Sequence, residues 1–224
     1  MTPAQMTAQV RSMLKQAGET VWARFPLATD FPRFRTAGLA ATNALQLFGG
    51  PLLVMRDPCL RPMREAVLRA NGTLVIPERA GVELLEIPAS ALQIPQDGSS
   101  AVLRIETAPP GSKPYCGPVQ AVVVGCHAFD PLRRRVYGMD TCRTEYLLGE
   151  LRDGLQNGWA LPANVPVVVL ASDAQQVQGW GDQGLAHEAD FVVTSTRLIA
   201  LGKGDTERID GQGANYIMEG DEDE

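Results

Sequence analysis

The feature that most constrains this chain is a set of continuous apolar runs that are rich in valine. Three of them lie in its second half, "VQAVVVGCHAF" (119–129), "VPVVVLAS" (165–172) and "ADFVVTSTRLIAL" (189–201). A strand with one face in water alternates apolar and polar residues, whereas a strand buried on both faces reads as an unbroken apolar run. The runs therefore predict central strands of a largely parallel sheet that is covered by helices.

The first half supplies a strand, a helix and a second strand. Two short apolar runs, "LLVM" (52–55) and "TLVIP" (73–77), flank "PMREAVLRANG" (62–72). Apolar residues of that segment recur at helical spacing, namely Met63, Ala66, Val67 and Ala70. Gly72 is predicted to cap the helix C-terminus. This order is typical of a parallel βαβ unit, and two further helices are predicted at about 4–24 and 37–48.

One domain is expected, because 224 residues suffice for one sizeable core. Residues 1–202 are assigned to it, and residues 203–224 are predicted to be a flexible acidic tail because they lack a core pattern. Between residues 78 and 118 only "AVLRIE" (101–106) alternates as an edge strand does. The predicted fold class is α/β, a single domain with three layers (α/β/α) and a largely parallel sheet.

The composition is that of an ordinary globular protein, with 45% hydrophobic residues and a mean hydropathy of -0.07. No apolar run approaches the roughly 20 residues of a membrane-spanning helix. The N-terminal segment "MTPAQMTAQVRSMLKQ" lacks the apolar core of a secretory signal. We therefore expect a cytoplasmic protein that does not enter a membrane.

The net charge of -6 is concentrated at one place in the sequence. Five of the 26 acidic residues lie in residues 219–224, so 21 acids face 20 bases elsewhere. A nearly neutral body has no general field that attracts nucleic acid, and nucleic-acid binding is not expected, although a local patch exists at Arg133, Arg134 and Arg135.

The cysteines do not predict a metal site. They form no C-x-x-C pair, and the chain has two histidines, so zinc is not expected. In a reducing compartment scattered cysteines are most simply small buried hydrophobes, and this applies to Cys59, Cys116, Cys126 and Cys142.

Cys126 and His127 adjoin at a strand end, but neighbours in a strand point to opposite faces and cannot pair for catalysis. One is expected in the core and the other on a pocket.

Ligands of open α/β sheets bind outside the carboxyl ends of the strands, which directs attention to residues after 129 and after 170. The first junction reads "RRRVYGMDTCRTE" (133–145), before a helix predicted near 141–157. A loop that wraps a phosphate normally needs several glycines, because N–H groups converge on an anion where φ is positive. This junction has three arginines and Gly138 instead.

These motifs together resemble the 5-formyltetrahydrofolate cyclo-ligase family. "VVVGCHAFDPLRRRVYG" is similar to its strand ending in Ala-Phe-Asp with a following Gly/Arg loop, "VPVVVLASDAQQV" to its second strand with a Gln-Val element, and "HEADFVVTSTRLI" to its His-acid pair before a final strand. "FPRFRTAGLAATNAL" and "RDPCLRPMREAVLRANGTLVIP" match the N-terminal half of one branch. The resemblance covers residues 5 to 201.

The resemblance implies an enzyme that binds ATP with Mg²⁺ and converts 5-formyltetrahydrofolate to 5,10-methenyltetrahydrofolate. In that reaction the formyl oxygen attacks the γ-phosphate, N10 closes the ring and phosphate leaves; the chemistry needs charge stabilisation of the transferred phosphoryl group. The catalytic candidates are Asp130 and Arg135. The cofactor-binding candidates are Arg133, Arg134, Arg135, Tyr137 and Gly138. The substrate-binding candidates are Asp57, Arg64, His127 and Phe129. The resemblance assigns no metal ligand.

The chain departs from the family pattern in the loop. Arg133 stands at the first glycine, Gly138 is the one glycine that one alignment retains, and Arg143 replaces the closing Asp in the same alignment. None of the three lysines matches the basic positions of the family. Two interpretations stay open: an anion site that works through arginine side chains, or a catalytically silent relative that binds a folate, a nucleotide or another anionic metabolite.

Several residues admit a structural interpretation beside the functional one. Asp57 and Arg64 could form an internal ion pair, and Phe129 and Tyr137 could be core residues instead of stacking on a ring. His187 and Glu188 match the His-acid pair of the family, with Asp190 two residues early. A third class of function, RNA binding or scaffolding, is supported only by the three arginines. The oligomeric state cannot be inferred from these patterns.

Overall fold

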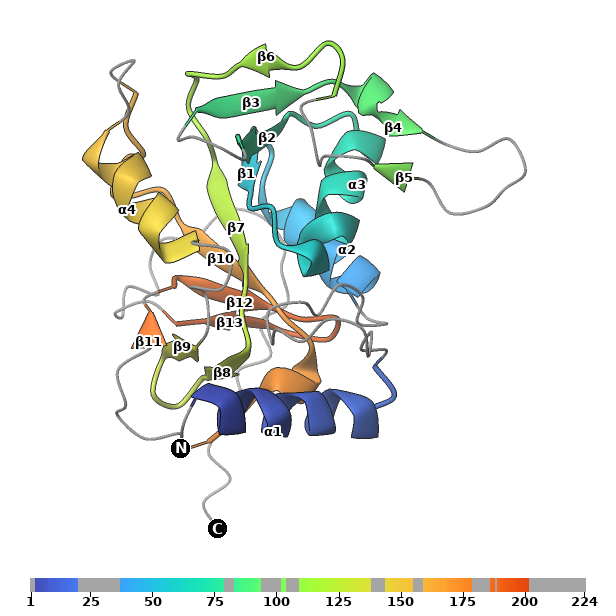
Figure 1. Ribbon diagram of the computed structural model, residues 1–224, viewed down its shortest axis with the longest axis vertical. Coiled ribbons are helices and arrows are strands. Elements are labelled where there is room, and N and C mark those ends of the chain that lie inside the picture. Colours follow the sequence, from blue (N-terminus) through green and yellow to red (C-terminus); the bar gives the residue numbers. More distant parts are fainter. Residues whose placement is uncertain are drawn as a thin grey trace.

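The valine-rich runs form the centre of an eight-stranded sheet in the computed structural model of the chain (Figure 1). The structure describes residues 3–19, 37–78, 83–93, 102–103, 109–137, 144–154, 159–178, 186–187 and 189–201. Across the sheet the strands are β13 (Leu198–Ala200), β12 (Phe191–Val193), β10 (Val167–Leu170), β7 (Ala121–Gly125), β1 (Leu52–Val54), β2 (Leu74–Pro77), β3 (Leu84–Ile87) and β6 (Lys113–Pro114). All neighbours from β12 to β2 are parallel, and antiparallel pairs occur only at the two edges. The predicted sheet is confirmed.

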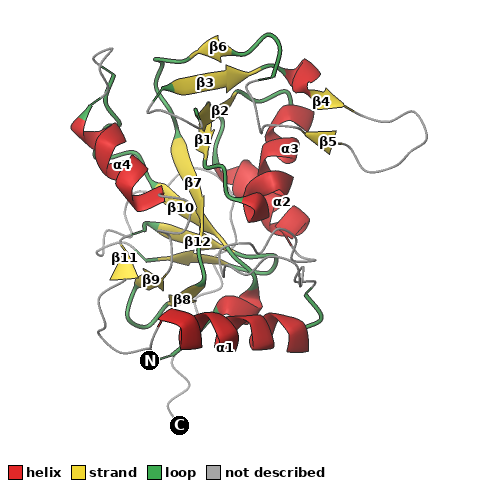
Figure 2. Cartoon of the chain, in the orientation of Figure 1, coloured by secondary structure: helices red, strands yellow, loops and turns green. Residues whose placement is uncertain are grey.

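Helices lie on both sides of this sheet, as the fold class required (Figures 1 and 2). Helix α2 (Ala37–Leu47) and helix α3 (Arg61–Arg69) pack together against one face, α3 between β1 and β2 in the chain. Helix α4 (Thr144–Asp153) lies on the other side of β7. Helix α1 (Pro3–Gln16) contacts the short 3-10 helix η4 (Asp173–Gln175), which follows β10, and so it lies at the carboxyl edge of the sheet.

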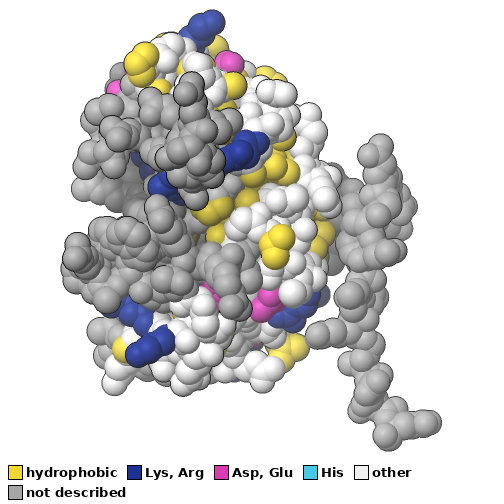
Figure 3. All heavy atoms as spheres, turned by 90° about the vertical axis from the view of Figure 1, so that its right-hand side faces the viewer, with side chains coloured by type: hydrophobic (Ala, Val, Ile, Leu, Met, Phe, Trp, Pro, Cys, Tyr) yellow, Lys and Arg dark blue, Asp and Glu magenta, His cyan; other side chains and the backbone are white. Residues whose placement is uncertain are grey.

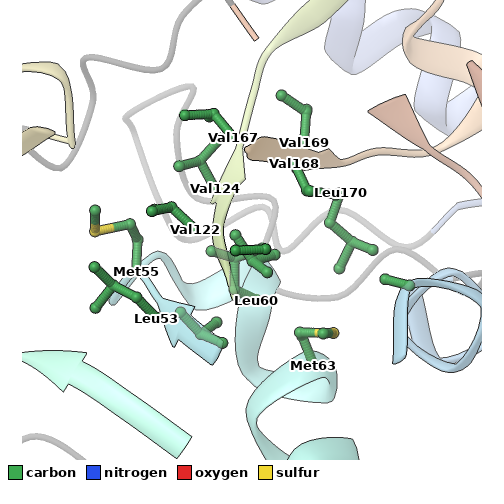
Figure 4. Close-up of a cluster of buried hydrophobic side chains, with 14 of the residues drawn as sticks. Leu53, Met55, Leu60, Met63, Val122, Val124, Val167, Val168, Val169 and Leu170 are labelled. Carbon is green, nitrogen blue, oxygen red and sulfur yellow. The ribbon is translucent and has the colours of Figure 1, made fainter. Parts of the chain in front are cut away.

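The core is formed where the central strands meet α3 (Figure 4). Leu53 of β1, Val124 of β7 and Val168 of β10 are fully buried, and Met63 of α3 is buried against them. Burying one such side chain is worth about 1.5–3 kcal/mol. The strands that carry the candidate site are thus held by the most apolar part of the sequence.

Two helices end at residues in the left-handed conformation. Helix α1 stops at Gln16, because Gly18 has φ of 71° and the Glu19 N–H donates to the carbonyl of Leu14 in a Schellman arrangement. The predicted continuation of this helix to about residue 24 is therefore wrong within the described residues. Helix α3 ends in the same way, but Asn71 with φ of 54° takes the left-handed position that was expected of Gly72.

Two of the apolar runs are divided into separate strands. The run 119–129 gives β7 and then β8 (Ala128–Asp130), which belongs to a second sheet of order β11-β9-β8. The run 189–201 gives β12 and β13, which form a hairpin closed by the bond from Thr194 N–H to the Arg197 carbonyl. Apolar periodicity cannot locate the first of these turns, because the residues of β7 and β8 on both sides of it are buried.

The second sheet also contains β9 (Arg135–Tyr137) and β11 (Ala186–His187), and a third pairs β4 (Leu92–Gln93) with β5 (Val102–Leu103). The edge strand expected within 101–106 is thus present in part.

No helix among the described residues is long and apolar enough to cross a membrane. Gly138, Cys142, Glu188 and residues 202–224 lie outside the described residues, as do the ends of the helix predicted near 141–157.

Hydrophobic side chains on the face shown in Figure 3 lie in small groups between polar ones. Leu39 and Leu132 are exposed large hydrophobic residues, with 63% and 77% of their surface accessible. Single exposed residues of this kind need no explanation, but Leu132 adjoins the arginines that the sequence singled out.

Candidate functional site

The carboxyl ends of the parallel strands form the candidate site. From β1 the chain crosses through α3 to β2 on one side, whereas β7, β10 and β12 follow one another on the other side. The direction of strand order therefore changes between β1 and β7, which is where open α/β sheets bind ligands. Asp57 and Cys59 follow β1 there, Cys126 and His127 follow β7, and η4 follows β10.

Arg64 of α3 is buried at this point, with 3% of its surface exposed. Its Nη1 donates to the main-chain oxygens of Met55 at 2.6 Å and Asp57 at 3.0 Å. Burial lowers the pKa of Arg64 to about 10, although the nearby charge of Asp57 acts in the opposite direction. Nε of Arg64 has no hydrogen-bond partner among the described residues. Arg64 thus holds the end of β1 through Nη1, while its Nε–H is a buried donor that this contact does not use.

Gly125, the last residue of β7, allows the segment after β1 to approach this strand. A Cβ at this position would lie 2.7 Å from Sγ of Cys59, closer than real Cβ contacts. Cys59 and Cys126 are both buried, and burial together with the Asp57 charge strongly raises the pKa of the Cys126 thiol. Cys116 is exposed, which corrects the expectation that it is a buried hydrophobe.

Replacing Gly125 with alanine is expected to lower the free energy of unfolding by about 1–2 kcal/mol, because overpacked cores lose about that much. The loss should shrink when Cys59→Ala removes the sulfur first, and urea denaturation of the four proteins of this double-mutant cycle measures the coupling. An equal loss in both backgrounds would show that the contact with Cys59 is not the cause.

Gln175 joins the ends of β7 and β10. It is fully buried, and its Nε2 donates to the carbonyls of Cys126 at 2.7 Å and His127 at 3.1 Å. Its Oε1 accepts the Ser172 N–H at 2.7 Å, while the Ser172 hydroxyl contacts Glu19 beyond α1 at 3.3 Å. One side chain thus ties two strand ends together, and the sequence indicated it only as part of the Gln-Val element.

The three arginines do not lie in a strand-to-helix phosphate loop. They lie on a hairpin between β8 and β9, with Asp130 opposite Arg135. Oδ1 of Asp130, which is fully buried, accepts the N–H groups of Leu132 at 3.1 Å and Arg133 at 3.2 Å. Arg133 and Arg134 are exposed and Arg135 is half-buried. Asp130 therefore shapes the turn, and residues 130–137 form a β-hairpin instead of a loop that leads from a strand directly into a helix.

Arg134 adopts the positive φ that the sequence argument reserved for glycine. Its φ is 54°, and its N–H donates to the carbonyl of Pro131 at 3.2 Å. A non-glycine residue in this region is uncommon, so the turn is held by its own hydrogen bonds and by the Asp130 carboxylate. A left-handed position is therefore available here without glycine.

The aromatic candidates lie in the core. Phe129 is fully buried and Tyr137 has 2% of its surface exposed, so neither ring presents a face on which a pterin or adenine ring could stack. This burial favours the structural interpretation of both residues. His127 is half-buried; its N–H donates to the Tyr137 carbonyl at 2.8 Å and its carbonyl accepts from Gln175. Asp190 accepts the Val167 N–H at 2.7 Å, which fixes the start of β10.

A polar cluster that the sequence analysis missed lies at the same edge of the sheet, where η4 after β10 contacts the turn after β12. The Asp173 carboxylate accepts hydrogen bonds from Thr194 at 2.8 Å, Ser195 at 3.2 Å, Thr196 at 2.9 Å, and Nε and Nη2 of Arg197 at 3.2 and 3.1 Å. Burial alone would raise the pKa of Asp173, but these donors and the Arg197 charge outweigh it and lower the pKa. The string "TSTR" in a run predicted as strand was the only signal.

Comparison with solved structures decides the fold. The NMR structure of 5,10-methenyltetrahydrofolate synthetase from Aquifex aeolicus matches with a TM-score of 0.52 and 16% identity, over 90% of this chain and 95% of that chain. The chain has the fold of that synthetase. A synthetase from Mycoplasma pneumoniae matches with a TM-score of 0.45 and 9% identity, over 85% of this chain and 98% of that chain. Family models and curated proteins give no match to the sequence.

The shared fold confirms the architecture that the resemblance implied. At 16% identity the likeness covers the fold alone, and the same fold can carry different functions. The chemistry of this chain must therefore be argued from its own residues at the carboxyl edge.

Proposed function

We propose that this chain binds a folate and ATP at the carboxyl edge of its sheet and converts 5-formyltetrahydrofolate to 5,10-methenyltetrahydrofolate, with ADP and phosphate as the other products. The observation that carries the proposal is the position of the motif residues. Arg64, His127 and the hairpin that bears Arg135 all adjoin the carboxyl ends of β1 and β7, in a fold shared with a synthetase for that product. This is the place where an open α/β sheet binds its ligand.

Guanidinium groups are suited to the phosphate part of this chemistry. Transfer of the γ-phosphoryl group of ATP to the formyl oxygen creates an activated carbon that N10 attacks, and phosphate then leaves. The charge on the transferred group needs fixed positive partners. Arg133, Arg134 and Arg135 present planar, permanently charged donors, which bind phosphate oxygens in pairs. The half-buried Arg135 is the catalytic candidate among them.

Two carboxylates of this edge, Asp173 and Asp130, are engaged by donors of the protein itself. Both oxygens of Asp173 accept hydrogen bonds from the protein, and Oδ1 of Asp130 accepts two N–H groups. Mg²⁺ prefers free carboxylate oxygens together with substrate phosphates. We therefore assign no magnesium ligand and no catalytic step to these two residues, and Asp130 is better described as a positioning residue of the turn.

A catalytically silent relative is the second candidate, and specific observations favour it. The hairpin turn at Arg134 is built from side-chain and main-chain bonds instead of glycines, and the buried rings of Phe129 and Tyr137 cannot stack on a ligand. Such a protein would bind a folate, a nucleotide or another anionic metabolite through the arginines without turnover.

The two candidates differ in one assay. The purified chain is mixed with 5-formyltetrahydrofolate and Mg-ATP, and the absorbance of the methenyl product is followed, with an ATP-free control. ATP-dependent product supports the cyclo-ligase. Folded protein that binds ATP or the folate without forming product supports the silent relative, and the absence of both binding and product contradicts the proposal.

The double substitution Arg134→Ala and Arg135→Ala is expected to weaken ATP binding by about tenfold or more, because each charge-assisted hydrogen bond to phosphate contributes on the order of 1.5–3 kcal/mol when shielded from water and less when exposed. Isothermal titration calorimetry measures the change. Arg69→Ala with Arg152→Ala is the matched control, since both arginines are exposed and belong to α3 and α4, which lie apart from β8 and β9 (Figure 1). An equal affinity in the two double variants would remove the hairpin from the ligand site.

A further inference from the structure

The hairpin tip, defined as residues 131–134, combines an apolar and a cationic surface. Leu132 has 77% of its surface exposed, and among the described residues the other large hydrophobic side chain that is exposed, Leu39, has 63%. Arg133 and Arg134 follow it and are exposed. An exposed leucine beside two guanidinium groups suits a partner that carries apolar and acidic side chains in adjacent positions.

The tip is rigid enough to act as a binding surface. The buried Asp130 carboxylate accepts the N–H groups of Leu132 and Arg133, and the Arg134 N–H donates to Pro131. The strands beneath it are anchored by Phe129 and Val136, both fully buried. The backbone therefore loses little freedom when a partner binds, which lowers the entropic cost of association.

A segment with apolar and acidic residues in adjacent positions, as such a partner would have, is present in the same chain. Residues 216–224 read "YIMEGDEDE", in which three apolar residues are followed by five acids within six positions. The remainder of the chain has 21 acids against 20 bases, so this segment is the main concentration of negative charge. Its order, apolar then acidic, matches the order of Leu132, Arg133 and Arg134 on the tip.

We propose that residues 216–224 bind the hairpin tip of their own chain, with the apolar residues on Leu132 and the acids on Arg133 and Arg134, and compete there with anionic ligands. The inference rests on the proposed function in one respect, which is that the arginines of the hairpin bind an anion. The 14 residues between Leu201 and Tyr216 can span up to about 50 Å, whereas a domain of this size has a radius of gyration of about 17 Å. Chain length therefore permits the contact.

The same chain is favoured over a separate acidic partner by effective concentration. Exposed ion pairs are weak individually and are screened by salt, so a free acidic peptide would bind the tip poorly. A segment joined by a short linker has an effective concentration on the order of millimolar. A weak contact of two arginines and one leucine can then be populated within one molecule.

Zero-length crosslinking tests the contact in the full chain. Arg133→Lys supplies an amine at the tip, and Arg69→Lys supplies one at the exposed end of α3 as a matched control. A carbodiimide joins each amine to carboxylates that touch it, and mass spectrometry maps the products. We expect the amide between position 133 and residues 219–224 to exceed that of position 69 by about fivefold or more, because the tip holds the segment at high effective concentration. Millimolar inorganic tripolyphosphate should reduce the amide at position 133 alone.

Three outcomes would overturn the proposal. Equal yields at positions 133 and 69 would show that the acidic segment has no preference for the tip. Crosslinks between two molecules would assign the tip to a second copy, and a yield unchanged by tripolyphosphate would show that the contact does not compete with anions. The test needs neither folate nor turnover, so a chain that forms no methenyl product can still confirm or exclude this contact.

Discussion

Replacing Arg64 with methionine is expected to lower the free energy of unfolding by about 3–5 kcal/mol, the range seen when one partner of a buried charged network is removed. The guanidinium donates to the main-chain oxygens of Met55 and Asp57, and methionine supplies no donor to either oxygen. A buried carbonyl that loses its partner costs about 1–3 kcal/mol; this applies to the Met55 oxygen, whereas the Asp57 oxygen still accepts the Leu60 N–H at 3.0 Å. The Asp57 charge would also lose its neighbouring cation. Urea denaturation followed by circular dichroism measures the loss.

Arg69→Met is the matched control for this prediction. Arg69 lies in the last turn of the same helix and is exposed, so its replacement should change stability by no more than about 0.5 kcal/mol. The loss of stability for Arg64→Lys should fall between those of the two methionine variants, because an ammonium group lacks the planar fork of a guanidinium and is expected to bind only one of the two carbonyls. A loss below about 1 kcal/mol for Arg64→Met, in the range of ordinary substitutions, would show that Arg64 does not hold the end of β1 and would favour a role in ligand binding.

Replacing Gln175 with leucine is expected to cost about 3 kcal/mol or more. The side chain is fully buried and makes three hydrogen bonds, to the carbonyls of Cys126 and His127 and from the Ser172 N–H. Leucine has a similar volume and can fill the space, but it leaves these main-chain groups without their partner at about 1–3 kcal/mol each. Thermal and urea denaturation measure the loss of stability.

The neighbouring residue provides the control. Gln176 is half-buried and accepts one bond from Arg197, so Gln176→Leu should cost less than about 1 kcal/mol. If Gln175→Leu is stable but loses ATP or folate binding, its role is to position the ends of β7 and β10 for the ligand. Equal, small effects of the two substitutions on stability and on binding would contradict both roles.

The sheet and the helices of this protein were predictable because burial on two faces leaves a direct trace in sequence. The runs around β1, β7, β10 and β12 lack polar interruptions, and α2 and α3 show helical spacing of apolar residues. The helix end after α3 was also predictable to within one residue, although Asn71 took the position expected of Gly72. Local patterns of this kind depend on residues that are near in sequence.

The turns inside the apolar runs were not predictable from the same patterns. The step from β7 to β8 lies between buried segments, so hydrophobicity does not mark it, and the turn from β12 to β13 lies in a run whose apolar residues resume after four polar ones. The part that Asp130 takes in the turn was not predictable for a related reason. A carboxylate after a strand can serve catalysis or close a turn, and only the positions of the Leu132 and Arg133 N–H groups distinguish the two.

The sequence by itself determined the α/β class, the parallel centre of the sheet and the edge at which to look for a site, because these follow from periodicity and from the order of strands and helices. Only the tertiary structure decided what the polar residues of that edge do. Arg64 and Gln175 bind main-chain groups, and Asp173 accepts hydrogen bonds from the turn after β12. Phe129 and Tyr137 belong to the core. The physical reason is that a polar side chain near a strand end has several possible partners, and residues distant in the chain decide which of them lies within hydrogen-bond reach.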